Sequence, residues 1–261
     1  MRLLVSVRSA DEAVLAANNG ADIVDAKEPD AGPLGPVSRS VLRAIEQTLP
    51  PHVPLGVALG DATVPAELAD VLDRLAPPVH AGGTFLKIGF AGVSRPEQVS
   101  AVLRRAVEQA GELGPSVAVI AASYADFGRA EALSPDGILD AAIGAGANGV
   151  LIDTWIKDGR GLLRHLSVDA LTVWVLRARR AGLLTALAGS IVADDLNVLR
   201  NIGPDVIGVR GAVCRGGRSG SLDPHRLHQL RATFDQEGGQ SGLPSSREMP
   251  EPAAHIAPLS P

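Results

Sequence analysis

Three lysines are the residues of this chain most suited to chemistry, because almost every other basic side chain is arginine. Lys27, Lys87 and Lys157 are the only lysines in a chain of 261 residues that holds 24 lysines and arginines together. A guanidinium stays protonated in proteins, whereas a lysine amine can lose its proton and act as a nucleophile or base. The lysines therefore indicate amine chemistry, unless they are the chance remainder of a compositional preference for arginine.

The positions of the lysines favour chemistry. Lys27 directly follows a short apolar segment, Lys87 lies near the end of another, and Lys157 lies four residues beyond Asp153, which ends a third. Side chains two residues apart on a strand share a face, so Asp25 and Lys27 should point the same way. An amine among apolar groups and beside another cation loses its proton more readily. The alternatives are a buried structural ion pair for Asp25 and Lys27, and a solvated loop position for Lys157.

Eight short β-rich segments alternate with eight helical patterns along the chain. The predicted strands are Arg2–Val7, Asp22–Ala26, Leu55–Leu59, Phe85–Gly89, Val117–Ala122, Gly149–Asp153, Leu183–Ala188 and Val206–Arg210. The predicted helices are Asp11–Asn19, Ser38–Leu49, Pro65–Leu75, Pro96–Ala110, Pro135–Ala145, Val168–Ala181, Asp194–Ile202 and Pro224–Phe234.

Strict strand–helix alternation predicts an α/β protein with a parallel sheet, and eight repeats predict a single (β/α)₈ TIM barrel over residues 1–234. An open doubly wound sheet is the alternative. It would need a glycine-rich turn after an early strand, and the first predicted strand is followed by Arg8-Ser9-Ala10 instead. Residues 235–261 are rich in Gly, Pro and Ser and lack apolar periodicity, which predicts a disordered tail.

The predicted barrel also suggests a phosphate site. Barrels of this type often bind phosphate with the loops after the seventh and eighth strands. These loops contain glycines, which let backbone N–H groups approach an anion. They also contain a serine hydroxyl and an arginine at a strand end, which could bind phosphate. The candidate phosphate-binding residues are Gly189, Ser190, Arg210, Gly211 and Ala212. Glycines at strand ends are also ordinary turn formers.

Two carboxylates complete the predicted site. Asp153 could relay protons or hold a substrate hydroxyl, and Asp61, after the third predicted strand, could do the same. Either residue could instead cap the loop that follows it. The predicted site needs no metal and no cofactor, and the six histidines lack the spacing of metal ligands.

Composition excludes several partners. The net charge is −5 and no long basic run occurs, so we expect no nucleic-acid partner. No stretch approaches the roughly 20 apolar residues of a membrane helix, so we expect no membrane partner. The single cysteine, Cys214, cannot form an internal disulfide and fits the cytoplasm. We expect a small-molecule substrate and, from the size of the barrel, a homo-oligomer.

Five segments, taken together and in order, resemble the (5-formylfuran-3-yl)methyl phosphate synthase family, also called 4-(hydroxymethyl)-2-furancarboxaldehyde-phosphate synthase. The resemblance spans residues 1 to 234. The segments are Asn19-Gly20-Ala21-Asp22-Ile23-Val24-Asp25-Ala26-Lys27-Glu28-Pro29, Leu86-Lys87-Ile88-Gly89, Asp153-Thr154 with Lys157-Asp158-Gly159, Ala186-Leu187-Ala188-Gly189-Ser190-Ile191, and Gly208-Val209-Arg210-Gly211-Ala212-Val213-Cys214.

The resemblance implies a carbon–oxygen lyase acting on phosphates. Such an enzyme condenses two molecules of glyceraldehyde 3-phosphate, with loss of phosphate and water, to a furan aldehyde used in methanofuran or methylofuran biosynthesis. It implies that Lys27 forms a Schiff base and that Lys87 accepts a proton. It gives Asp25, Asp153 and Lys157 supporting roles in the active site. Two other functions fit the residues: a different Schiff-base aldolase acting on an aldose phosphate, and a sugar-phosphate sensor without enzymatic activity.

Overall fold

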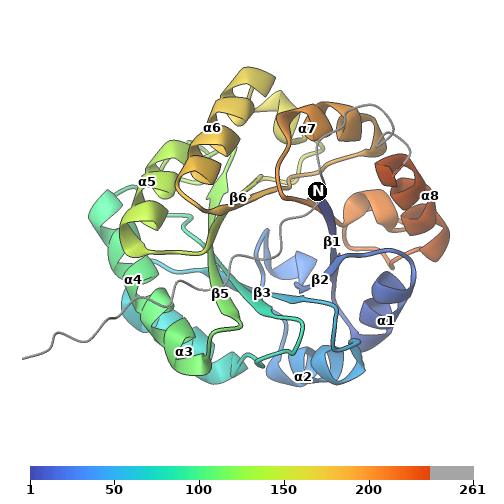
Figure 1. Cartoon of the computed structure of the whole chain (residues 1–261), viewed down its shortest axis with the longest axis horizontal. Coiled ribbons are helices and arrows are strands. Elements are labelled where there is room, and N and C mark those ends of the chain that lie inside the picture. Colours follow the sequence, from blue (N-terminus) through green and yellow to red (C-terminus); the bar gives the residue numbers. More distant parts are fainter. Residues whose placement is uncertain (236–261) are drawn as a thin grey trace, which may run out of the picture.

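Eight parallel strands form a closed barrel in the part of the chain that is described, residues 1–235 without the side chain of Arg74. The structure is a computed structural model. The strand order is β1 to β8 along the chain, and β8 pairs with β1 to close the barrel. Figure 1 looks onto the strands, with the helices arranged around them. The predicted (β/α)₈ fold class is confirmed.

All the predicted strands and helices are present, with small differences at their ends. The strands are β1 (Arg2–Val7), β2 (Ile23–Ala26), β3 (Leu55–Asp61), β4 (Thr84–Gly89), β5 (Val117–Tyr124), β6 (Gly149–Asp153), β7 (Leu184–Leu187) and β8 (Val206–Val209). The α-helices are α1 (Ala10–Asn18), α2 (Arg39–Thr48), α3 (Pro65–Leu75), α4 (Pro96–Leu113), α5 (Pro135–Ala145), α6 (Val168–Arg180), α7 (Leu196–Ile202) and α8 (Pro224–Asp235). Short 3₁₀ helices are η1 (Pro29–Ala31), η2 (Leu162–Arg164), η3 (Ala193–Asp195) and η4 (Gly211–Val213).

The differences have local causes. Strands β3 and β5 run two residues further than predicted, because Asp61 pairs with Gly89 and Tyr124 pairs with Asp153 on the neighbouring strands. The predicted helix at Asp194–Ile202 starts as a 3₁₀ turn before it becomes α7. Of the predicted tail, only Asp235 lies within the described residues, where it ends α8.

Sequence signals fix where several helices begin and end. Ser9 precedes α1, and its hydroxyl accepts a hydrogen bond from the N–H of Glu12, which satisfies a donor that the first helical turn leaves free. Ser134 caps α5 in the same way, accepting from the N–H of Gly137. At the other end of α5, Gly146 takes a left-handed conformation at φ +73°, where a side chain would be strained.

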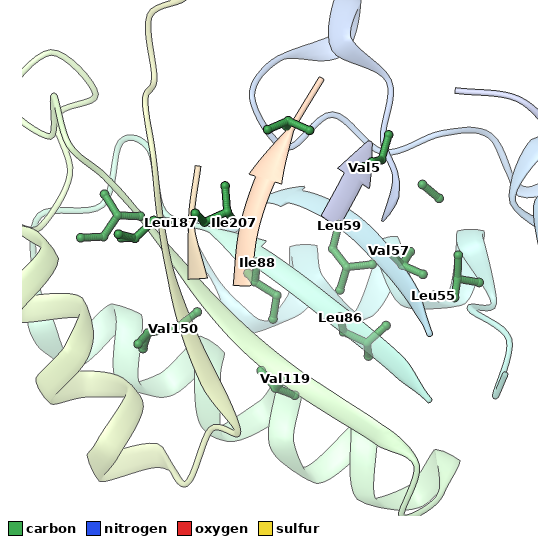
Figure 2. Close-up of a cluster of buried hydrophobic side chains, with 14 of the residues drawn as sticks. Val5, Leu55, Val57, Leu59, Leu86, Ile88, Val119, Val150, Leu187 and Ile207 are labelled. Carbon is green, nitrogen blue, oxygen red and sulfur yellow. The ribbon is translucent and has the colours of Figure 1, made fainter. Parts of the chain in front are cut away.

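Side chains alternate between the two faces of each strand, and the outer face forms the main core. Leu86, Ile88 and Val119 are almost fully buried in the layer between the barrel and its helices, and Figure 2 shows them among their neighbours. Burying a side chain of this size stabilises a fold by about 1.5–3 kcal/mol. The covered outer face therefore leaves the inner face free to carry polar groups.

The inner face changes character along each strand. On β2 it carries Ile23 and then Asp25, and on β6 it carries Leu151 and then Asp153. The apolar residues fill the lower part of the barrel, and the charged residues follow at the C-terminal ends of the strands. The fold therefore gathers charge at one mouth of the barrel, which is where barrels of this type carry their sites.

Candidate active site

A cavity of about 350 Å³ opens at the C-terminal ends of the strands. All three lysines of the chain line it, together with two of the predicted carboxylates. The charged residues that share the cavity are Lys27, Lys87, Lys157, Asp25 and Asp153. The sequence prediction that these side chains lie together is therefore confirmed, whereas their chemical roles remain predictions.

Lys87 on β4 forms a buried ion pair with Asp25 on β2. The Lys87 Nζ lies 2.5 Å from Asp25 Oδ1, and the side chains are 5% and 0% exposed. Ser6 donates its hydroxyl hydrogen to Asp25 Oδ2 over 2.9 Å. Burial lowers the pKa of Lys87, and the nearby Lys27 ammonium lowers it further, although Asp25 opposes both effects. Lys87 is therefore better suited to act as a base than an exposed lysine would be.

Asp153 at the end of β6 lies between the other two lysines. Its Oδ1 is 2.6 Å from Lys157 Nζ, and its Oδ2 is 3.7 Å from Lys27 Nζ. The N–H of Thr154 also donates to Oδ1. Burial alone would raise the pKa of Asp153, but the two lysines outweigh it and lower the pKa to about 2. Asp153 is therefore an anion throughout the neutral range.

Lys157 reaches back from the loop after β6 into the cavity. Its amine donates to Asp153 and to the hydroxyl of Thr154 over 2.9 Å. Burial lowers the pKa of Lys157, Asp153 raises it, and Lys27 lowers it again. The solvated position considered for Lys157 is wrong, because its side chain is only 14% exposed.

Lys27 differs from the other two lysines in its contacts. Within residues 1–235 its amine makes no hydrogen bond, and its ion pair with Asp153 Oδ2 is long at 3.7 Å. Its side chain is 12% exposed and lines the cavity. Asp25, which shares its strand face, pairs with Lys87 instead. Of the three amines, Lys27 is thus the one least engaged with protein groups.

The loops after β7 and β8 contribute the predicted phosphate-site residues to the same cavity. Gly189, Ser190, Gly211 and Ala212 all line it. A side chain at Gly189 would not fit, since a Cβ there would lie 2.9 Å from the methyl group of Thr154 and φ is +107°. The close approach of these two backbones therefore requires glycine.

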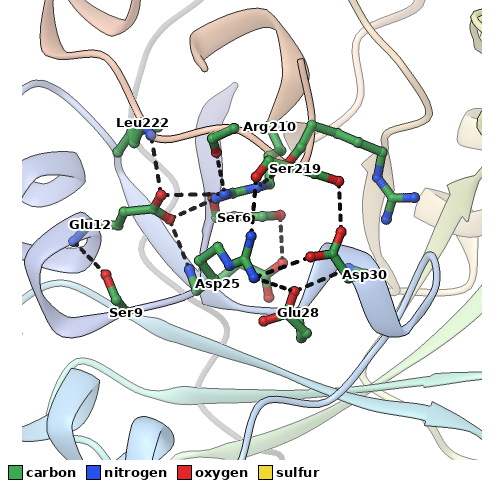
Figure 3. Close-up of polar contacts among 12 residues, drawn as sticks. Ser6, Ser9, Glu12, Asp25, Glu28, Asp30, Arg210, Ser219 and Leu222 are labelled. Atoms are coloured by element: carbon green, nitrogen blue, oxygen red, sulfur yellow. Dashed lines mark hydrogen bonds and ion pairs between the residues drawn. The ribbon is translucent and has the colours of Figure 1, made fainter. Parts of the chain in front are cut away.

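Arg210 also lines the cavity, but its guanidinium is not free to hold a phosphate. Its five N–H groups donate to Glu12 Oε1 and Oε2 and to the carbonyls of Ser6, Arg218 and Gly220, at 2.7 to 3.3 Å. Figure 3 shows Arg210 beside Glu12. The geometry runs against the predicted clamp because an arginine has only five donors.

Asp61, by contrast, is not among the residues that line the cavity. Its Oδ1 accepts hydrogen bonds from the hydroxyl of Tyr124 at 2.7 Å and from the N–H of Ala91 at 2.8 Å. A Cβ at Gly89 would lie 2.3 Å from that oxygen, so the strand makes room for the carboxylate. Burial raises the pKa of Asp61 despite these two donors. The contacts support a structural role between β3, β4 and β5.

Two residues of the site escaped the sequence analysis. Ser6 on β1 orients Asp25, and nothing in its local sequence marks it. Arg218 lines the cavity from the loop after η4. A signal for Arg218 does exist, because it stands among glycines and a serine in Gly216-Gly217-Arg218-Ser219-Gly220. Arg210 was predicted as the cation of this region because it stands at the end of the eighth predicted strand.

Residues 1–235 contain neither a cluster of metal ligands nor a membrane-spanning helix. No group of three His, Cys, Asp or Glu side chains in residues 1–235 is placed to hold a metal ion. No helix in this part is long and apolar enough to cross a membrane.

A closed (β/α)₈ barrel with a lysine-lined cavity at its C-terminal mouth is the architecture of an enzyme. Residues 3–231 match the sequence model of the family described as 4-HFC-P synthase, and the chain belongs to this family. Curated relatives carry the corresponding enzyme name. The chain is 36% identical over 247 residues to the putative (5-formylfuran-3-yl)methyl phosphate synthase of Kitasatospora aureofaciens, covering 93% of this chain and 98% of the relative.

A second relative is archaeal. The (5-formylfuran-3-yl)methyl phosphate synthase of Methanosarcina barkeri is 33% identical over 232 residues, which is 89% of this chain and 98% of the relative. Among solved structures, phosphoribosyl anthranilate isomerase from Thermus thermophilus superposes with a TM-score of 0.59 at 18% identity, covering 90% of this chain and 99% of that one. A 3-hexulose-6-phosphate synthase from Salmonella typhimurium gives 0.56 at 18% identity, covering 90% and 100%. At these identities the structures support the fold alone.

Proposed function

We propose that this enzyme condenses two molecules of glyceraldehyde 3-phosphate to (5-formylfuran-3-yl)methyl phosphate through a Schiff base on Lys27. The observation that carries the proposal is the state of the Lys27 amine. It lies in the cavity without a hydrogen bond from residues 1–235, while Lys87 and Lys157 are held in short ion pairs. An amine that attacks a carbonyl needs a free lone pair and access to the substrate.

The charges of the cavity suit a phosphorylated aldehyde. Lys27, Lys87 and Lys157 face two carboxylates, Asp25 and Asp153. With Lys27 as the neutral nucleophile these charges balance, and Arg218, which lines the same cavity, adds positive charge for an anionic substrate. The overall change also fits a lyase, because two triose phosphates contain one phosphoric acid and two waters more than the furan product.

The chemistry divides between the side chains. Attack of the Lys27 amine on an aldehyde carbon expels water and gives an iminium, which is an electron sink and acidifies the adjacent C–H. Lys87 accepts that proton, and burial, which lowers its pKa, makes it a better base than an exposed lysine. Loss of phosphate, carbon–carbon bond formation with the second triose and loss of water then lead to the furan. Hydrolysis of the iminium returns the Lys27 amine.

Asp153 and Lys157 have supporting roles in this scheme. Asp153 remains ionised, so its Oδ2 stabilises the cationic iminium that forms on Lys27. Lys157 holds the other oxygen of Asp153 and fixes the direction of the carboxylate. In the cell, the furan aldehyde would enter the synthesis of a methanofuran or methylofuran cofactor.

Borohydride trapping tests the proposal directly. Incubation with glyceraldehyde 3-phosphate and borohydride should leave a reduced adduct on Lys27, identified by peptide mass spectrometry. Lys27→Arg keeps the charge but loses the nucleophile, so this variant should form no adduct and no furan. Lys157→Arg is the matched control, and it should still be labelled at Lys27.

The product separates the alternatives. A furan aldehyde gives a new ultraviolet absorption, and mass spectrometry gives its composition. A product without that absorption, together with an adduct on Lys27, would indicate a different Schiff-base aldolase. Binding of the sugar phosphate without adduct or turnover would indicate a sensor. Full activity in Lys27→Arg would rule out the amine mechanism.

A further inference from the structure

We infer that Arg218 is the side chain that binds the phosphate group of the substrate, and that Arg210 is the positioning residue that holds Arg218 in place. The inference deepens the proposed function and rests on it for the nature of the phosphate ester. Its own content is a phosphomonoester subsite built by the loops after β7 and β8, with the cation supplied by a residue of the glycine-rich loop 215–220.

Arg218 enters the cavity from this loop and is only lightly held. Its side chain lines the cavity with Lys27 and Lys157. Its one hydrogen bond within residues 1–235 runs from Nη2 to the carbonyl of Gly32 at 3.1 Å. A guanidinium has five N–H donors, so most of those of Arg218 have no acceptor in the described part of the chain.

The half-buried guanidinium also lacks a direct counter-ion. No carboxylate of residues 1–235 forms a salt bridge with Arg218, and the attraction of Asp153 and Asp30 acts from further away. Removing a cation from water is costly unless an anion compensates for it. Arg210 shows the contrast, since Glu12 binds it with both oxygens. The unmatched charge of Arg218 points to an anionic ligand.

Residues with backbone N–H groups unpartnered within residues 1–235 line the same cavity. The N–H groups of Gly189, Ser190, Gly211 and Ala212 donate to no backbone carbonyl or side chain among residues 1–235, and all four residues line the cavity. Ser190 has φ +51°, a left-handed conformation that residues other than glycine rarely adopt. Successive N–H groups in such turns form anion-binding concavities. The oxygens of one phosphate group would supply acceptors for these N–H groups and for the guanidinium.

Arg210 fixes the loop that carries Arg218. Its Nε–H donates to the carbonyl of Arg218 at 2.7 Å, and Nη2 donates to the carbonyl of Gly220 at 2.9 Å. The turn itself requires glycine, because a Cβ at Gly220 would lie 1.6 Å from the carbonyl oxygen of Arg215. Arg210 therefore acts on the ligand through Arg218.

The loop is also tied to the segments that follow the neighbouring strands β1 and β2. Ser219 donates its hydroxyl hydrogen to Asp30 at 2.7 Å, and Arg8 donates to the carbonyl of Ser219 at 3.1 Å. Figure 3 shows Ser219 and Asp30 joined beside Glu28. A guanidinium on a loop held at both sides loses little freedom on binding, which favours bidentate recognition of phosphate.

Titration with inorganic phosphate tests the inference without any turnover. Calorimetry should show that Arg218→Gln weakens phosphate binding by about 10- to 100-fold, the range for a lost charge-assisted hydrogen bond. Arg215→Gln removes the same charge from the same loop, but Arg215 is 77% exposed and pairs with Asp223 outside the cavity. Phosphate affinity in this control should stay close to that of the wild type.

The two proposals fail in different ways. If Arg218→Gln binds phosphate and turns over glyceraldehyde 3-phosphate with an unchanged KM, the inference is overturned and the proposed function stands. If the wild type makes no furan but binds phosphate in an Arg218-dependent way, the proposed function fails and the subsite stands.

If Arg218→Gln melts at a clearly lower temperature, Arg218→Lys replaces it in the test, because lysine keeps the charge but lacks the two-pronged guanidinium. It should then weaken phosphate binding by a smaller factor, and wild-type affinity in it would contradict bidentate recognition.

Unphosphorylated glyceraldehyde gives a second readout. Borohydride trapping of glyceraldehyde on Lys27 should be the same in the wild type and in Arg218→Gln, because this aldehyde has no phosphate to anchor. Trapping of glyceraldehyde 3-phosphate should fall in the variant. Equal losses for both aldehydes would mean that Arg218 acts on the fold of the site instead, and would overturn its assignment to phosphate.

Discussion

Lys87 and Asp25 contact each other across a strand that separates them. Lys87 lies on β4 and Asp25 on β2, and the pair closes to 2.5 Å over the inner face of β3. Gly56 is the β3 residue opposite Asp25 in the register. A Cβ at Gly56 would lie 2.5 Å from Asp25 Oδ1, so the contact depends on the missing side chain.

Gly56→Ala should therefore break the pair. The new methyl group has to displace the Asp25 carboxylate, which leaves the Lys87 amine without its partner. We expect kcat to fall by about tenfold or more and the free energy of unfolding to fall by about 1–3 kcal/mol, the range for overpacking. Furan formation and denaturant unfolding measure the two effects.

Gly144→Ala is the matched control. Gly144 lies in α5, and a Cβ there meets nothing within 4 Å. Because alanine is the better helix former, this variant should gain up to about 1 kcal/mol of stability with unchanged kcat. A Gly56→Ala enzyme that behaves like this control would show that the Lys87–Asp25 contact does not depend on the glycine.

The pH dependence of activity should report on the same pair. Burial lowers the pKa of Lys87, Lys27 lowers it too, and Asp25 and Asp153 raise it. The neutral amine accepts the proton, so kcat/KM should rise as pH increases through the pKa of Lys87. Asp25→Asn removes an anion that raises this pKa, and the rising limb should therefore move to lower pH.

Ser6→Ala provides the comparison for this pH profile. It removes the hydrogen bond to Asp25 Oδ2 but keeps the carboxylate. Its rising limb should move much less than that of Asp25→Asn. A shift of the Asp25→Asn limb to higher pH would mean that Lys87 is not the group whose titration limits kcat/KM.

The sequence predicted the local features of the site better than the contacts between residues far apart in the chain. Strand positions and the alternation of faces are local properties, and they placed Lys27, Lys87 and Asp153 at one mouth. The partner of Asp25 is not local, because the contact with Lys87 exists only after the sheet has curved into a barrel and Gly56 has left space. The sequence therefore placed these side chains at one mouth but put Asp25 beside Lys27, whereas Asp25 pairs with Lys87.

The contacts of Asp61 and Arg210 differ from those that the sequence suggested, for related reasons. The register between β3 and β4 shifts between Ala58 and Asp61, so simple alternation does not tell where Asp61 points. Arg210 follows a strand, as a phosphate ligand would, but Glu12 from the distant helix α1 takes its guanidinium. Only the path of the loop after β8 shows that Arg218 lines the cavity with donors that have no acceptor within residues 1–235.

Tyr124→Phe tests the structural assignment of Asp61. The variant keeps the ring that meets Trp155 edge-on at 5.2 Å between centroids, and it loses only the hydroxyl that donates to Asp61. Asp61 keeps the Ala91 N–H, so the loss should be about 1 kcal/mol of unfolding free energy. KM should not change. A large rise in KM at wild-type stability would return Asp61 to the substrate site.

Arg210→Lys should separate positioning from binding. An ammonium has three donors and no fork, so it cannot replace the five hydrogen bonds of Arg210 to Glu12 and to the carbonyls of Ser6, Arg218 and Gly220. Arg210 is 6% exposed, and part of the Glu12 carboxylate would be left unpaired. We expect the free energy of unfolding to fall by about 3 kcal/mol, as when a buried pair is broken.

Arg210→Lys should also change the KM for the substrate, because Arg210 acts through Arg218. Once Arg210 no longer binds the carbonyl of Arg218, the loop does not hold the Arg218 guanidinium over the cavity, and KM for the phosphorylated aldehyde should rise. Arg218→Gln should raise KM as well, but with little loss of stability, because the Arg218 side chain makes one hydrogen bond within residues 1–235, to the carbonyl of Gly32. Denaturant unfolding together with steady-state kinetics distinguishes the two patterns. If Arg210→Lys loses stability and keeps its KM, Arg210 supports the barrel alone and does not position Arg218.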